Sequence, residues 1–354
     1  MNELSKLKSA TTGDLLDRTF SPRTMILDPW LRNEETCVLW AATGVGKTMF
    51  SLSLALAVAG GGKLGDWDAP QARRVLYIDG EMNIRDLQER LQMMVRDMDI
   101  LTTPEQSEAA LENLTITARQ DQELGSSFYD ITDPEHQKHL IREVKGKYDL
   151  LILDNFTTLS SGLDDENDAT AFKKVQDLFL ELKREGVSTI LVHHANKGGH
   201  SMRGSTALEA TFEIIVGLKK PKVSAPGQAK FRAEFTKYRS KGDHRIANRV
   251  WTLEANGWNV AEDVPEDPKE DPVYAALKSL QYTSGREIAE ALGMGKTTVA
   301  NRLNYLIAMK AITKAERDEC YKQARSLRNP EGHTSADVIG DMPGPEGKVL
   351  DEVW

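Results

Sequence analysis

The stretch LWAATGVGKTMFSL, residues 39–52, decides the fold that we expect for this protein. The apolar residues 36–41 (TCVLWA) predict a short buried strand, and the apolar spacing of MFSLSLALAVAG, residues 49–60, predicts a helix. Gly44 and Gly46 stand between the two, and Lys47 and Thr48 follow directly. A glycine-rich turn in this place aims backbone N–H groups at a phosphate, which the positive end of the helix also attracts. The stretch therefore predicts a nucleotide phosphate-binding loop.

Two side chains at the end of this loop are expected to act on the nucleotide. In such a loop the lysine, here Lys47, reaches the β- and γ-phosphates, and the hydroxyl of Thr48 ligates Mg²⁺. Ala41 departs from the usual pattern because it stands where the first glycine is expected, but a small residue still allows the turn. The residues expected to line a bound ATP are Ala42, Thr43, Gly44, Val45, Gly46, Lys47, Thr48 and Met49.

A second Gly-Lys-Thr, in ALGMGKTTVANRL at residues 291–303, does not predict a second nucleotide site. Counted back from Lys296, the position of the first loop glycine is Glu290, and the preceding SGREIAEAL has helical rather than strand periodicity. Ser284 is a plausible N-cap for that helix, with Glu287 three residues later. The segment thus predicts helix, tight glycine turn and helix, which is typical of a helix-turn-helix. The candidate nucleic-acid contacts on the second helix are Lys296, Thr297, Thr298 and Arg302.

Composition excludes several classes of protein. The chain has 354 residues, a 40% apolar fraction and a formal charge of −9, which argues against coating nucleic acid by bulk charge. Cys37 and Cys320 lie far apart, so neither a disulfide framework nor a structural zinc site is supported. The polar start has no apolar signal region, and the longest apolar run is too short to span a bilayer. We therefore expect a cytoplasmic protein with no membrane partner.

Strands alternating with helices predict an α/β fold with a mainly parallel sheet covered on both faces. Expected strands lie near residues 36–41, 73–81, 113–118, 148–154 and 187–195, and shorter connections near 211–258 indicate antiparallel strands. We expect an ATPase domain at residues 1–260, with residues 1–20 as an arm. An acidic, proline-rich linker at 261–272, a helix-turn-helix or winged-helix domain at 273–325 and a flexible tail at 326–354 are expected to follow.

Polar residues at the ends of later strands complete the expected NTPase site. Asp154 ends the apolar strand YDLLILD and could hold Mg²⁺ through a water. In VLYIDGEM, Glu81 is favoured over Asp79 as the base that orients and deprotonates the attacking water. In ILVHHANK, His194 is favoured over His193 as a contact to the γ-phosphate that reports its loss.

The order of these parts resembles the RecA-type ATPases, and most closely the RepA-like hexameric replicative helicases of plasmids and phages. The resemblance covers roughly residues 20–258. It implies a RecA-like ATPase that forms a hexameric ring and binds ATP between neighbouring subunits. Lys237 and Arg239 in FTKYRS match the family's Lys-x-Arg, which enters the neighbour's site and could neutralise charge on the γ-phosphate.

The same resemblance implies that loops after the third and fourth strands hold single-stranded DNA. The loop TTLSSGLDDENDAT is acidic and would repel a phosphate backbone, whereas NKGGHSMRGSTALEA is the better candidate. Its expected DNA contacts are Lys197, His200 and Arg203, although Arg203 could equally serve the nucleotide or a subunit interface. In the C-terminal domain, residues 271–328 contain ten Lys/Arg and six Asp/Glu, a net of +4 that favours duplex DNA. Such modules also dock proteins.

The leading prediction is an ATP-driven DNA motor, a hexameric replicative helicase of a plasmid, phage or mobile element. The alternative is a DNA-bound ATPase switch for replication, recombination or transposition that does not unwind DNA. A third and weaker alternative is an NTPase whose C-terminal domain recruits a protein partner. Translocation polarity, the DNA site, nucleotide preference and host replicon do not follow from the sequence.

Overall fold

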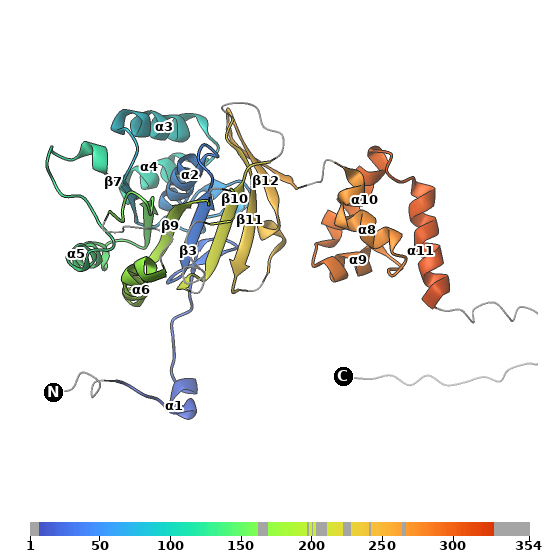
Figure 1. The fold of residues 1–354 in the computed structure, drawn as a ribbon, viewed down its shortest axis with the longest axis horizontal. Coiled ribbons are helices and arrows are strands. Elements are labelled where there is room, and N and C mark those ends of the chain that lie inside the picture. Colours follow the sequence, from blue (N-terminus) through green and yellow to red (C-terminus); the bar gives the residue numbers. More distant parts are fainter. Residues whose placement is uncertain are drawn as a thin grey trace, which may run out of the picture. The chain divides into compact units, whose positions relative to one another are not determined.

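The structure, a computed structural model, describes residues 7–161, 169–196, 198–199, 201–202, 211–221, 228–240, 242–263 and 267–328. The chain divides into two compact units, Met1–Asp263 and Val264–Trp354. The first is built on a large sheet with helices, and the described part of the second is helical (Figure 1).

A nine-stranded sheet forms the centre of the N-terminal unit, in the order β13-β12-β11-β10-β3-β9-β8-β6-β7. Neighbouring strands from β10 to β7 run parallel, whereas β11, β12 and β13 extend the sheet antiparallel. The strands are β3 (Thr36–Ala41), β6 (Val75–Asp79), β7 (Leu114–Ala118), β8 (Leu150–Asp154), β9 (Ser188–His194), β10 (Ile214–Lys219), β11 (Lys230–Tyr238), β12 (Arg249–Glu254) and β13 (Gly257–Glu262). The expected α/β fold with a mainly parallel, RecA-like core is confirmed.

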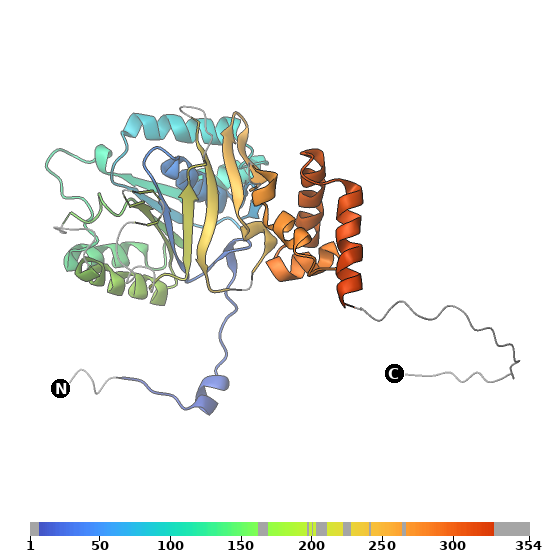
Figure 2. The same ribbon diagram turned by 45° about the vertical axis from the view of Figure 1, so that its right-hand side comes forward.

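Helices cover both faces of the sheet because alternate side chains of its inner strands are apolar on both sides. In β8, Leu150 and Ile152 join one core, and Leu151 and Leu153 join the other. The first core contains α2 (Lys47–Gly60), α3 (Ile84–Asp97) and α4 (Pro104–Asn113), and the second contains α5 (Pro134–Val144) and α6 (Ala169–Arg184). Figure 1 shows the two groups on opposite sides of the sheet, and the turned view of Figure 2 agrees.

An aromatic cluster anchors the start of α2 to the antiparallel end of the sheet. Phe50 lies edge-on to Trp67, Phe231, Trp251 and Trp258, at ring-centroid distances of 5.1–6.0 Å. Trp67 comes from the short hairpin of β4 (Lys63–Leu64) and β5 (Trp67–Asp68). Buried aromatic side chains contribute large apolar areas, and edge-on pairs add to this. The cluster therefore fixes the helix that follows the phosphate-binding loop.

The expected linker at 261–272 is shorter in the structure. Ala261 and Glu262 lie at the end of β13, which pairs with β12 as a hairpin across residues 255–256. At the other end, the Asp271 side chain is fully buried and caps the helix α8 (Pro272–Lys278). Asp271 and Pro272 therefore begin a helix, in a stretch whose proline and acidic content predicts a linker.

Four helices form the described part of the C-terminal unit, around one apolar core. They are α8, α9 (Gly285–Leu292), α10 (Lys296–Ala308) and α11 (Lys314–Arg328). Ser284 caps α9 by accepting the N–H of Glu287, as expected, and Gly293 ends that helix with φ +63°. The helix, tight turn and helix of α9 and α10 match the prediction. Residues 267–328 contain no strand, so a wing is not part of the described structure.

An exposed arm precedes the sheet domain. All residues from 7 to 24 are exposed, including the short helix α1 (Thr12–Leu16). Thr11 accepts the N–H of Asp14, whose carboxylate accepts the N–H of Thr11, so a capping box holds α1 without help from the domain. Among the described residues, no helix combines the length and apolar character needed to cross a membrane.

We expect Phe50→Ala to destabilise the N-terminal unit by about 3–5 kcal/mol, because a large buried ring would leave a cavity at the start of α2. Urea unfolding followed by tryptophan fluorescence measures this, since five of the six tryptophans lie in that unit. Leu124→Ala, at a fully exposed side chain, serves as the control. A loss of stability no larger than the control's would contradict the role given to the cluster.

Candidate active site

Four parallel strands end at one edge of the sheet and bring the predicted polar residues together. The register places Ala41 of β3 opposite His194 of β9 and Asp79 of β6 opposite Asp154 of β8. A cavity of about 470 Å³ opens at this edge. Its lining comes from the loop before α2 and the first residues of α2, from the ends of β6, β8 and β9 with the residues after them, from α3, and from the residue before β11. It comprises Thr43, Gly44, Gly46, Lys47, Thr48, Met49, Asp79, Glu81, Met82, Asn83, Asp86, Arg90, Asp154, Asn155, His194 and Ala229.

The loop between β3 and α2 has the backbone of a phosphate cradle. Gly44 and Gly46 have φ values of +76° and +108°, in the region that side-chain-bearing residues rarely adopt. A Cβ on Gly46 would also lie 3.0 Å from the Cβ of Ala229. No side chain caps the amino end of α2, so its first N–H groups face the loop without a side-chain acceptor. Such an end attracts an anion.

Lys47 begins α2 and is buried beside acidic groups. Its Nζ lies 3.4 Å from Nδ1 of His194. Burial lowers the pKa of Lys47, while the negative charges of Asp154 and Glu81 act in the opposite direction. A cation held in this way is positioned to meet negative charge that enters the cavity.

Asp154 is buried at the tip of β8, and its side chain is held by two hydroxyl groups. The Tyr77 hydroxyl donates to Oδ2 of Asp154 at 2.6 Å, and the Ser51 hydroxyl lies 3.5 Å from the same oxygen. Ser51 and Tyr77 also contact each other at 2.8 Å. Burial raises the pKa of Asp154, whereas the hydrogen bonds from Tyr77 and Thr48 lower it. The carboxylate is therefore oriented from behind by Tyr77 and adjoins Thr48 on the loop side.

Asp79 and Glu81 have different surroundings although they are two residues apart. Oδ1 of Asp79 accepts the backbone N–H groups of Glu81 and Met82, so this buried carboxylate shapes the turn after β6. Burial raises the pKa of Asp79. Glu81 is exposed at the cavity, and the buried Asn155 donates its Nδ2–H to Oε2 of Glu81 at 2.6 Å. Of the two acids, Glu81 is the one presented to a ligand.

The two histidines at the end of β9 point to opposite faces of the sheet and have different surroundings. His193 is fully buried and lies edge-on to Phe156 at a ring-centroid distance of 4.9 Å. His194 lines the cavity beside Lys47. This follows from strand alternation, which points successive side chains to opposite faces.

Lys237 and Arg239 lie away from this cavity in the same chain. Lys237 pairs with Ile215 of β10, which in turn pairs with Val38 of β3. The phosphate-binding loop begins after Ala41, three residues beyond Val38, so Lys237 lies about 10 Å from it along the strand direction. Because β11 runs antiparallel to β10, Arg239 lies still further from the loop. These two cations do not join the site within one chain.

The predicted nucleic-acid residues fall into three groups. Lys197, His200 and Arg203 lie outside the described residues. Lys296 and Thr297 are exposed at the start of α10, and Thr298 is half-buried. Arg302 is different, because its buried guanidinium pairs with the fully buried Asp271 at 3.0 Å. This burial does not fit the DNA contact expected for Arg302, which instead ties α10 to the start of α8.

Tyr77, Ser51, Asn155 and Arg90 belong to the site but were not predicted from the sequence. Ser51 lies one turn after Lys47 on α2, and Tyr77 lies two residues before Asp79 on β6, so periodicity could have placed both near the strand tips. Asn155 directly follows Asp154, and its contact with Glu81 depends on the neighbouring strand.

Oxygen donors at this edge suit a hard cation such as Mg²⁺. Thr48, at the start of α2, and Asp154, at the end of β8, both line the cavity. Mg²⁺ is commonly held by one or two protein oxygens together with phosphates and water, rather than by a complete protein cage. The described residues contain no cluster of three or more His, Cys, Asp or Glu side chains that could hold a metal by themselves.

Comparisons with known proteins found similar solved structures and one matching family. Similar solved structures include that of the RadB recombinase, 13% identical, which aligns over 65% of this chain and 91% of that one with a TM-score of 0.42. Another is a KaiC-like protein from the hyperthermophilic archaeon Pyrococcus horikoshii OT3, 16% identical over 68% of this chain and 99% of that one, with a TM-score of 0.46. No curated protein matched the sequence. The family profile described as an AAA domain matches residues 2–200.

Proposed function

The chain belongs to the AAA domain family, and we propose that it is an ATP-driven motor that acts on DNA, a ring-forming replicative helicase of a plasmid, phage or mobile element. The family and the fold show that the chain is a nucleotide-hydrolysing P-loop ATPase. The observation that carries the proposal is the meeting of Lys47, Glu81, Asp154 and His194 around one glycine-rich loop. Each supports a distinct task in phosphoryl transfer to water.

Lys47 and the N–H groups at the start of α2 would bind the β- and γ-phosphates. Because Lys47 is buried, its charge acts on the phosphates with little screening by water. Thr48 and Asp154 would hold Mg²⁺, which neutralises charge on the phosphate oxygens when it is bound. His194 beside Lys47 is placed to contact the γ-phosphate and to pass its loss to the loop that follows β9.

Glu81 would orient the attacking water and accept its proton. Its carboxylate faces the cavity with one oxygen held by Asn155, which leaves the other oxygen for water. A base needs hydrogen-bond reach and a defined orientation before it needs a tuned pKa. Asn155 supplies the orientation.

For Lys237 and Arg239 we propose a role in the site of a neighbouring subunit. Both lie further from the carboxyl edge of the sheet than their own loop does, so we assign them a contact with the ATP of a neighbouring subunit. Cations that enter a site in this way stabilise charge in the transition state. This arrangement supports a ring or other closed assembly with one ATP at each subunit interface.

DNA binding is proposed for two regions. The loop with Lys197, His200 and Arg203 follows the strand that carries His194, so nucleotide state and DNA contact would be linked through β9. At the start of α10, Lys296, Thr297 and Thr298 remain candidates for contacts with duplex DNA. A DNA-bound ATPase switch would use the same residues and differs in that it does not separate strands.

Glu81→Gln is expected to lower the kcat of DNA-stimulated ATP hydrolysis by about 10²–10⁴-fold, because the amide cannot accept the proton. Nucleotide affinity should change little, since the phosphate-binding loop is untouched. Hydrolysis by phosphate release and affinity by titration with a fluorescent ATP analogue measure the two effects. A variant with near-normal hydrolysis would refute the assignment of Glu81. Glu123→Gln, on the exposed segment after residue 121, is the matched control.

Tyr77→Phe is expected to weaken metal binding by about 10-fold, because loss of a group that orients a metal ligand has this typical cost. Mn²⁺ binding to the ADP complex, followed by electron paramagnetic resonance, measures the effect, and ADP affinity without metal should be unchanged. Tyr238→Phe is the matched control, since its hydroxyl donates to the Pro29 carbonyl away from Asp154. Equal loss of metal binding and metal-free ADP binding would indicate a general structural role instead.

Arg239→Ala and Lys47→Ala are each expected to lose hydrolysis, the former by about 10³-fold or more if it acts as an arginine finger. A mixture of the two inactive variants should recover part of the activity. In such a mixture, some interfaces join the intact loop of one variant to the intact Arg239 of the other. Hydrolysis that stays absent in well-mixed assemblies would contradict action between subunits.

A further inference from the structure

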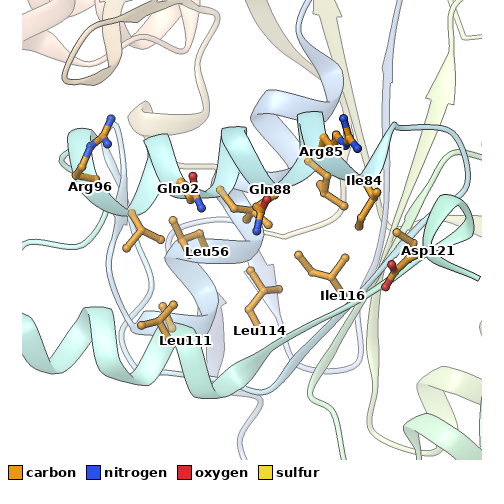
Figure 3. A pocket seen from close by; sticks show the side chains of 15 residues that line it. Leu56, Ile84, Arg85, Gln88, Gln92, Arg96, Leu111, Leu114, Ile116 and Asp121 are labelled. Carbon is orange, nitrogen blue, oxygen red and sulfur yellow. The ribbon is translucent and has the colours of Figure 1, made fainter.

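An apolar groove and the exposed face of α10 both lie outside the nucleotide cavity. The groove, of about 760 Å³, runs between α3, α4 and β7, with Leu56, Leu114 and Ile116 below α3 (Figure 3). Its apolar lining would suit many partners and identifies none. The exposed face of α10 differs, because its amide side chains have the hydrogen-bonding groups that recognise one class of ligand.

The helical period divides α10 into a buried and an exposed side. The buried residues are Val299, Arg302, Leu303 and Leu306. The exposed residues on the other side, which we call the α10 face, are Thr297, Ala300, Asn301, Asn304 and Ala308. They follow one another at the three- and four-residue spacing of one helix face. The face is therefore open to a partner along its whole length.

Two carboxamides, those of Asn301 and Asn304, stand on this face. Among the described residues, neither amide has a hydrogen-bond partner. A carboxamide offers a donor and an acceptor side by side, which match N7 and the N6 amino group of adenine in the major groove. The methyl groups of Thr297 and Ala300 suit contact with the methyl group of thymine. The α10 face thus has the chemistry to read A·T base pairs.

The position of these side chains on α10 fits entry into the major groove. In a helix-turn-helix, the amino-terminal residues of the second helix meet the base edges. Thr297, Ala300 and Asn301 lie in the first two turns of α10, and Asn304 follows one turn later. On the buried side, the ion pair between Arg302 and Asp271 fixes this helix to the start of α8. The face is therefore held by contacts that leave it free.

Positive charge lies beside the face. Residues 291–315 contain no acidic residue. A cavity of about 320 Å³ borders the face at Ala300. The charged residues of its lining are Arg286, Lys296, Arg317 and Asp318. Arg286 and Arg317 are each paired with an acid of their own helix, at 2.9 and 2.7 Å. Lys296 has no ion-pair partner among the described residues, so it is the cation best able to bind a phosphate.

We propose that the C-terminal unit reads A·T base pairs of duplex DNA in the major groove, with Asn301 and Asn304 on adenine and Thr297 and Ala300 against thymine methyl groups. Lys296 would bind a phosphate beside them. This inference rests on the proposed contact of α10 with duplex DNA, and it assigns base reading to the exposed face instead of to Arg302. It requires neither ATP hydrolysis nor strand displacement.

Selection from a library of random-sequence duplexes by the full-length protein, without ATP, tests the proposal. We expect the bound duplexes to share a short motif in which A·T pairs are fixed. On the selected duplex, Asn301→Ala and Asn304→Ala should each weaken binding by about 5–150-fold, the cost of one bidentate base contact. Binding of an unselected duplex should change little. Gln323→Ala removes an exposed carboxamide from α11 of the same unit, and as the matched control it should change neither.

Replacement of adenine by 7-deazaadenine in the selected duplex tests the contacts themselves. This base still pairs with thymine but lacks the N7 acceptor of the major groove. It should weaken binding by the unaltered protein, and the loss should be smaller for the asparagine variant that no longer contacts that position. Lys296→Ala should instead weaken binding of both duplexes alike and lower its salt dependence, as expected for one phosphate contact.

The proposal is overturned if the bound duplexes share no motif with A·T pairs, if the preference survives both asparagine substitutions, or if 7-deazaadenine has no effect. A preference that survives both substitutions is also the result expected if the α10 face docks a protein. Strand displacement that persists without any sequence preference would refute base reading alone. Sequence preference that depends on Asn301 and Asn304 in a protein that separates no strands would support base reading and refute the motor.

Discussion

The amino end of α2, held at the carboxyl edge of a parallel sheet, is the constraint on which the rest of the structure depends. Strands β3, β6, β8 and β9 all run in the same direction, so their last residues meet at the same edge as the helix start. Gly44 and Gly46 allow the chain to turn between β3 and α2. The aromatic cluster around Phe50 then packs the first turn of α2 against the antiparallel strands.

This constraint explains which parts of the site could be predicted from the sequence. The predicted residues lie at the end of a strand or shortly after it: Lys47, Thr48, Glu81, Asp154 and His194. Because the strands are parallel, their ends meet at the carboxyl edge of the sheet. The cavity brings these residues together. Their chemical roles remain predictions, because position at an edge decides what a side chain can reach and not what it does.

Contacts across strands were less predictable. In the sequence, Tyr77 resembles the other apolar residues of its strand. Its hydroxyl reaches Asp154 only because of the register between β6 and β8, which the sequence does not predict. Arg302 stands at an ordinary recognition-helix position, but its partner Asp271 lies in a stretch whose composition predicts a linker. The helix α4 was also missed, although Thr103 as N-cap and Pro104 in its first turn are signals of a helix start. Such features depend on pairing between distant segments or on weak local patterns.

In the proposed motor, ATP hydrolysis at the carboxyl edge of the sheet changes the contacts with DNA. His194 ends the strand that precedes the loop expected to hold DNA, and in the proposed assembly Lys237 and Arg239 would contact the ATP of a neighbouring subunit. A motor and a switch share these parts and differ in whether hydrolysis moves the protein along a strand. Strand displacement from a forked DNA substrate, compared between ATP and a non-hydrolysable analogue, tests this most directly. We predict displacement with ATP alone, whereas DNA-stimulated hydrolysis without displacement on forks of either polarity would contradict the motor.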